Sequence, residues 1–169
     1  MAHTESLYIA ALTATPTQRN KLHDGNTESQ IVASNVEWAP AADGDTLSIC
    51  RIPVNAKILR CSLAYDDLAS TSGTANLGFY AGNDATPTSA GTLVDEDALA
   101  TALDIGGGAV AMTDQRYEVK GIETTKQVAW ELAGLSAQPD YGDFTLALTC
   151  AALTGTQAGT VAWIVEFTL

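Results

Sequence analysis

The chain has 169 residues, with 20 acidic and 8 basic side chains and a net charge of −12. A chain of this length suits one domain that buries about 70% of its unfolded surface and needs no disulfides. The acidic excess argues against nucleic acid as a partner, because affinity for phosphates depends on a basic surface that releases counterions. There is no run of about 18 apolar residues and no cationic stretch before an apolar core. We therefore expect neither a membrane span nor a signal peptide.

The first 28 residues are mostly polar, apart from the apolar stretch LYIAAL at positions 7–12. We expect residues 1–28 to form an N-terminal arm and residues 29–169 to form a single β-sandwich domain. The arm is either a loosely ordered terminus or an extended segment that lies across a neighbouring subunit. In the second case its candidate partner contacts are Leu7, Tyr8, Ile9, Leu12, Arg19 and Lys21.

Alternation of apolar and polar residues predicts β-strands from residue 30 onward. The expected strands span residues 31–38, 46–52, 57–65, 76–80, 116–122, 125–132, 143–153 and 159–169. In the last strand, one face carries Val161, Trp163, Val165, Phe167 and Leu169, so a slip of one residue would turn its aromatic side chains out of the core. The short connection at residues 154–159 predicts that the last two strands pair as an antiparallel hairpin.

One helix is expected, at residues 95–103. Asp95, Glu96 and Asp97 would lie in its first turn, where the helix dipole favours negative charge, and Leu99 and Leu103 would face the core. Capping explains these carboxylates without a metal site or a catalytic pair. The whole pattern predicts an all-β protein, a two-sheet antiparallel β-sandwich of the jelly-roll type with one short inserted helix.

No arrangement of residues typical of an enzyme accompanies these strands. The serines lie in no GxSxG motif, and the two histidines, His3 and His23, both fall in the arm. Cysteines at positions 50, 61 and 150 lack CxxC spacing and lie in expected strands, which predicts buried free thiols. The sequence Asp43-Gly44-Asp45 is typical of a turn, the alternative being a pair of calcium ligands. We expect no catalytic residue, no metal and no cofactor.

Two sets of side chains are candidates for contact with a partner. Besides the arm residues, Arg51, Lys57 and Arg60 lie close together in sequence around a predicted turn, and they either solvate the strands or form a docking patch for an acidic partner. In the strand at 57–65, Leu59 is expected to share a buried face with Cys61, Leu63 and Tyr65, opposite Arg60.

The aromatic residues bear on a second class of function, a carbohydrate-binding or adhesion module. Trp130 and Trp163 are in phase with apolar neighbours, so they are expected in the core. Trp38, at a strand end, and Tyr141, in a turn, are better candidates for exposure. Exposed aromatic side chains on a β-sandwich would favour sugar binding.

The segment from residue 51 to 110 resembles small structural proteins of tailed-bacteriophage virions. The matching positions are Ile52, Pro53, Ala56 and Ile58, then Leu77 to Tyr80 with Asn83 and Asp84, then Asp97, Ala98 and Leu99. The resemblance implies a non-enzymatic head decoration or cement protein, a β-sandwich that binds over the capsid lattice, often as a trimer. It implies as partner the major capsid protein or another virion protein, with no role for a membrane or nucleic acid.

The same resemblance implies a location in the virion, after assembly in the host cytoplasm. A reducing cytoplasm is consistent with three free cysteines. Repeated weak contacts over a lattice are sufficient for firm attachment, so each subunit would need only a modest interface.

Overall fold

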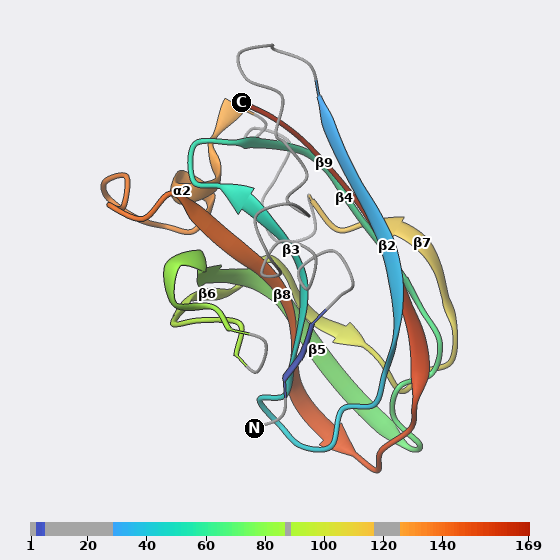
Figure 1. Cartoon of the computed structure of the whole chain (residues 1–169). Coiled ribbons are helices and arrows are strands. Elements are labelled where there is room, and N and C mark those ends of the chain that lie inside the picture. Colours follow the sequence, from blue (N-terminus) through green and yellow to red (C-terminus); the bar gives the residue numbers. More distant parts are fainter. Residues whose placement is uncertain (1–2, 6–28, 87–88, 117–125) are drawn as a thin grey trace, which may run out of the picture.

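The computed structural model describes residues 3–5, 29–86, 89–116 and 126–169, which form a sandwich of two β-sheets (Figure 1). The strands are β1 (His3–Glu5), β2 (Gln30–Trp38), β3 (Thr46–Pro53), β4 (Lys57–Tyr65), β5 (Ser72–Ala81), β6 (Leu93–Asp104), β7 (Val110–Asp114), β8 (Asp143–Thr154) and β9 (Gly159–Thr168). One sheet has the order β1-β3-β8-β5-β6, and the other has the order β2-β9-β4-β7. All pairs are antiparallel except β1 with β3. The predicted two-sheet antiparallel β-sandwich is confirmed.

Most connections cross from one sheet to the other. Between β2 and β9, the only consecutive described strands that lie in the same sheet are β5 and β6. The core therefore collects side chains from the whole length of the domain, and Leu47, Phe79, Leu99, Phe144 and Trp163 are among its fully buried members. This crossing makes the predicted hairpin of the last two strands wrong: β8 and β9 lie in different sheets, and residues 155–158 bridge them.

The alternation predicted for the last strand is confirmed along β9. Val161, Trp163, Val165 and Phe167 are buried, whereas the residues between them are half-buried. β9 lies inside its sheet, between β2 and β4, so one face of the strand is held against the core along its full length. The prediction for Leu169 is wrong, because this residue follows the end of β9 and is 47% exposed.

A bulge changes the pattern in β4. Its pairing with β9 shifts register between Ile58 and Arg60, so one extra residue is inserted opposite the neighbouring strand. Ile58 and Cys61 are buried, whereas Leu59 between them is 41% exposed. The prediction that Leu59 lies on the buried face is therefore wrong, although it holds for Cys61, Leu63 and Tyr65.

The helix predicted at residues 95–103 is wrong, because these residues belong to β6. Three register shifts interrupt the pairing of β6 with β5, and Ala98, Leu99 and Ala100 are buried one after another. Such bulges place apolar residues at spacings that imitate a helix. Gly78 of β5 permits the close approach, since a Cβ there would lie 2.0 Å from the carbonyl oxygen of Asp95. Pairing with a long neighbouring strand thus overrides the acidic first-turn pattern.

The strand predicted at 125–132 is also wrong. From residue 126 onward the described segment contains the helical turn α2 (Ala129–Leu132), in which the backbone N–H of Val128 donates to Glu131 Oε2 (3.1 Å). Backbone bonds from Ala129 and Trp130 to the turn after β3 hold α2 against the sandwich. Of the strand predicted at 116–122, residues 117–122 lie outside the described part. No helix in the described residues is long and apolar enough to cross a membrane.

Candidate functional site

The outer face of the five-stranded sheet is covered by the protein itself around β8. Thr145, Ala147 and Thr149 face away from the core and are nevertheless buried. Tyr80 and Ala90 pack on Ala147, and the Tyr80 hydroxyl shares a 2.7 Å hydrogen bond with Thr149 Oγ1. These residues are therefore closed to a partner.

The outer face of the four-stranded sheet is more open. In β9, Ala162, Ile164 and Glu166 are half-buried, and in the edge strand β2 Ile31 is 65% exposed. The strand register places Ile164 beside Ala33 of β2, with Glu166 nearer the end of the sheet. A small apolar centre with charged residues towards its rim is typical of protein contact surfaces. The sequence does not predict this face, because alternation separates the two faces of each strand without showing which strands lie side by side in a sheet.

The same face is hollowed beside β7. A depression of about 400 Å³ lies between β4, β9 and the segment that leads into β7. Its lining residues are Ala64, Tyr65, Asp66, Ala109, Val110, Ala111, Thr160 and Ala162. The lining is mostly small and apolar.

The three basic candidates for partner contact fall on different sheets. Lys57 and Arg60 lie on β4 and are exposed, with Arg60 Nε donating to Ser62 Oγ (2.8 Å). Arg51 lies on β3 in the other sheet, where one guanidinium nitrogen is 3.6 Å from Asp143 Oδ2 and the other donates to the carbonyl oxygen of Ala85 (3.4 Å). Lys57 and Arg60 are thus the members of this set that are open to an acidic partner.

The ion pair of Arg51 with Asp143 joins β3 to β8 at one end of the sandwich. Burial raises the pKa of the Asp143 carboxyl, and the neighbouring Arg51 opposes that rise. Arg51 Nε is buried without a hydrogen-bond partner among the described residues. The pair is therefore a structural contact, and it leaves Arg51 committed within its own chain.

The remaining candidates for partner contact, Leu7, Tyr8, Ile9, Leu12, Arg19 and Lys21, lie outside the described residues. Within the predicted arm, the structure describes β1 alone, which extends the five-stranded sheet by pairing with β3. The role of the arm stays a prediction.

The aromatic residues give no exposed platform for a sugar in the described part of the chain. Trp38 is 2% exposed, so the prediction that it lies on the surface is wrong; it closes the end of β2 over the core. Tyr141 is half-buried and packs edge-on against Phe144, with ring centroids 5.6 Å apart. Trp163 is buried as predicted, whereas Trp130 is half-buried and packs against the core.

Groups with catalytic potential are dispersed or buried where the structure describes them. Cys50, Cys61 and Cys150 are buried free thiols, as predicted, and burial raises the pKa of each of them, that of Cys61 to about 12. A thiol with so high a pKa is a poor nucleophile. Among the described residues, no three His, Cys, Asp or Glu side chains gather in a way that could hold a metal ion.

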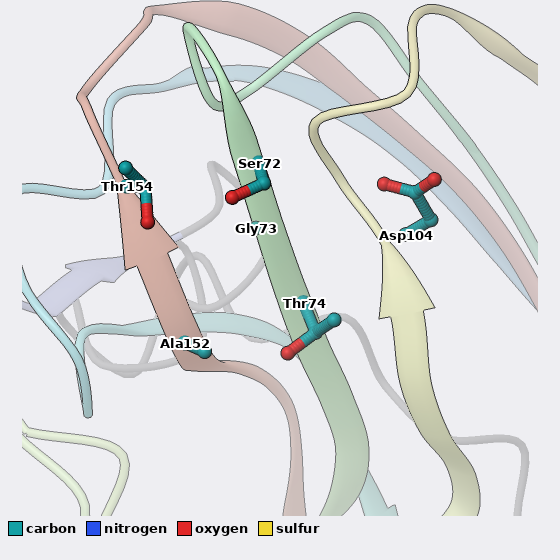
Figure 2. A pocket seen from close by; sticks show the side chains of 6 residues that line it. All are labelled: Ser72, Gly73, Thr74, Asp104, Ala152 and Thr154. Carbon is teal, nitrogen blue, oxygen red and sulfur yellow. The ribbon is translucent and has the colours of Figure 1, made fainter.

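A shallow pocket of about 200 Å³ lies at the ends of β5, β6 and β8. Figure 2 shows the side chains that line it. Its lining residues are Ser72, Gly73, Thr74, Asp104, Ala152 and Thr154. Ser72 of β5 lies opposite Thr154 of β8, and Asp104 of β6 lies on the other side of β5 from Thr154. Asp104 Oδ1 accepts a hydrogen bond from the Gly106 N–H (3.0 Å). Three hydroxyl side chains and one carboxylate thus line this pocket, and no imidazole or amine belongs to its described lining.

Comparison with known proteins finds likeness in structure. No protein-family model and no curated protein matches this chain. A chain from the capsid of Ralstonia phage GP4 has a TM-score of 0.59 and 18% identity, covering 99% of this chain and 97% of that one. A chain from the Cyanophage Pam1 capsid asymmetric unit has a TM-score of 0.39 and 18% identity, covering 93% and 99%. At this identity the first likeness shows a shared fold over the whole chain, and the second has too low a TM-score to support an argument.

Proposed function

We propose that this protein is a structural, non-enzymatic component of a bacteriophage virion that decorates the head and stabilises its lattice. The observation that carries the proposal is the fold shared, over 99% of this chain and 97% of the other, with a chain of the Ralstonia phage GP4 capsid. Coverage of nearly all of both chains means that the likeness concerns the whole sandwich and not one motif. The sequence resemblance to phage virion proteins points in the same direction.

The order of the strands supports this proposal. The sheets β2-β9-β4-β7 and β3-β8-β5-β6 contain eight strands that pass repeatedly between the two layers. We interpret this order as a jelly roll, an architecture that serves in viral capsids and in lectins. The capsid alternative is favoured here because Trp38 is buried and Tyr141 packs on Phe144, so neither of these two candidates offers an aromatic platform for a sugar in the described part of the chain.

A binding experiment with empty shells tests the proposal. Shells assembled from the major capsid protein of the same phage genome are mixed with the purified protein and separated on a density gradient. We expect the protein to migrate with the shells at a fixed ratio and to raise the temperature at which they fall apart. Protein that stays at the top of the gradient at every ratio, or that instead binds a glycan array, contradicts the proposal.

The exposed basic pair on β4 gives a sharper form of this test. We propose that Lys57 and Arg60 contact an acidic partner, since both are exposed on the open sheet. The double variant Lys57→Glu, Arg60→Glu is expected to weaken shell binding about tenfold or more, because charge reversal turns attraction into repulsion. Lys126→Glu is a control for the reversal of a single exposed charge, to be compared with Lys57→Glu alone, since Lys126 is exposed and lies outside the strands of the four-stranded sheet. Equal binding by both variants would exclude this part of β4 from the contact.

The arm and the oligomeric state are part of the same proposal. We propose that residues 1–28 reach a neighbouring subunit once the protein is bound to the shell, where the resemblance implies a trimer. Removal of residues 1–28 is expected to reduce shell binding while the sandwich still folds, as judged by circular dichroism. Full binding by the shortened protein contradicts the role of the arm.

A further inference from the structure

The sheet edges in the described part of the chain differ in how they are protected. An open edge presents unpaired N–H and C=O groups that can bind a further strand, and proteins usually guard against this. β3 is covered by β1, whereas β6 is distorted by three register shifts and carries the acidic run at residues 95–97. β7 is only five residues long and pairs with β4 around a bulge. Each of these edges has a recognised protection.

The edge of β2 has none of these protections. Its nine residues pair with β9 in an unbroken register from Gln30 to Trp38. The strand contains no proline, glycine or basic residue, and its one charged side chain is Glu37. Among the described residues, the backbone of β2 forms hydrogen bonds with β9 alone. A long, regular edge with Ile31 65% exposed beside it is a site where another strand can pair.

We propose that this edge is an interface between two copies of the chain, which pair antiparallel through β2 about a twofold axis at Ser34. With the axis at Ser34, every residue of β2 is paired with a residue of the other copy, because Ser34 is the midpoint of Gln30–Trp38. The two four-stranded sheets then become one continuous sheet of eight strands. Twofold contacts of this kind are self-complementary and closed, so they do not propagate into fibres.

The side chains of β2 fit this register on both faces. On the inner face, Val32 of one copy lies opposite Val36 of the other, which extends the core across the contact. On the outer face, Ala33 lies opposite Asn35, and the exposed Ile31 lies opposite Glu37. No like charges meet, since each Glu37 is opposite an apolar residue. Strand pairs of this type are the unit by which sheets are stabilised.

Charge at position 31 tests both the contact and its register. Ile31→Glu places a second carboxylate opposite Glu37 twice in each dimer, whereas Ile31→Lys places a cation there. Both variants remove the same exposed side chain, and both place a charge beside Glu166 of the same chain, so the stability of each variant is measured alongside its association. We expect the wild-type protein to dimerise in sedimentation equilibrium, and Ile31→Glu to dimerise about tenfold or more weakly than Ile31→Lys.

A crosslink tests the position of the axis. In Ser34→Cys the two new thiols face each other across the axis, at the roughly 4.5 to 5.5 Å Cα spacing of opposed strand residues, which suits a disulfide. The native cysteines are buried and do not compete. Mild oxidation is expected to give a covalent dimer, whereas the control Thr113→Cys, exposed on the opposite edge strand β7, gives little.

Three results would overturn the inference. They are a wild-type protein that stays monomeric across micromolar concentrations, equal association by the two variants at position 31, and a trimer in which the thiol introduced by Ser34→Cys remains reduced. The contact does not depend on the proposed role at a shell. A protein that binds shells but does not dimerise would contradict only the proposed twofold contact. A protein that dimerises but does not bind shells would contradict only the proposed decoration role.

Discussion

The two regions that differ most in regularity are β9 and the pair formed by β5 and β6. β9 alternates buried and half-buried residues without interruption and has a paired strand on each side. β6 lies at an edge, shifts register three times against β5, and buries Ala98, Leu99 and Ala100 in succession. β9 itself carries no inserted residue, since the bulge in its pairing with β4 lies in β4. Period two is therefore kept in a strand without inserted residues, and it is lost where bulges accumulate.

The difference also has an energetic side. In β9 the core is filled by large side chains that point inward at every second position, so stability depends on volume. In β5 the close approach of β6 depends on an absent side chain, because Gly78 lies against the backbone of Asp95 and Glu96. One region is sensitive to the removal of atoms and the other to their addition, and the following substitutions test that contrast in order of expected effect.

The largest loss is expected for Phe167→Ala in β9. Phe167 is fully buried, so the substitution removes apolar contacts and leaves a cavity, at a cost of about 3–5 kcal/mol in the free energy of unfolding. Guanidinium denaturation followed by tryptophan fluorescence measures it. Deletion of Leu169, which is 47% exposed, is the control and should cost less than about 0.5 kcal/mol. Similar losses of unfolding free energy in both proteins would mean that the inward-facing positions of β9 contribute no more to stability than the exposed residue after it.

The second effect is expected for Gly78→Ala in β5. The new Cβ would lie 2.0 Å from the carbonyl oxygen of Asp95, so β6 must move away and part of its pairing with β5 is lost. A cost of about 1–3 kcal/mol is expected in the same denaturation experiment. Gly142→Ala is a matched control, since no heavy atom lies within 4 Å of the position of its Cβ. A neutral Gly78→Ala would show that β6 adjusts freely at this point.

These contrasts explain how much the sequence could predict. Alternation of apolar and polar residues predicts the strands β2, β3, β4, β8 and β9, because each of them pairs over most of its length with a neighbour. Alternation does not predict β6, since the bulges that bring Leu99 into the core depend on β5, more than ten positions earlier in the chain. The burial of Trp38 likewise follows from the facing sheet, which the local sequence does not contain.

The candidate site was less accessible to sequence reasoning than the fold. Lys57 and Arg60 were correctly grouped as neighbours on one strand, but Arg51 belongs to the other sheet and is bound to Asp143. The open edge of β2 is a property of sheet order, because a strand is an edge only in relation to the strands beside it. Its sequence does carry one indication, the lack of proline, glycine and basic residues over nine positions.

The smallest effect on stability is expected for a substitution of Asp143. This carboxyl lies at the start of β8, and burial raises its pKa above the ordinary value of 3.8 despite the nearby Arg51. The folded protein therefore retains the proton at a pH at which the unfolded chain has released it. As the pH rises from 3.8 through the raised pKa, the wild-type protein loses stability by this route.

Asp143→Asn removes that dependence, because an amide does not titrate. The free energy of unfolding of Asp143→Asn, relative to that of the wild-type protein, should therefore rise with pH across this window and become constant above it. The total rise should be smaller than the loss caused by Gly78→Ala. Urea denaturation of both proteins at a series of pH values measures the difference. A difference that falls as the pH rises would mean that attraction to Arg51, 3.6 Å away, outweighs burial, and that this end of the sandwich is held by its ion pair.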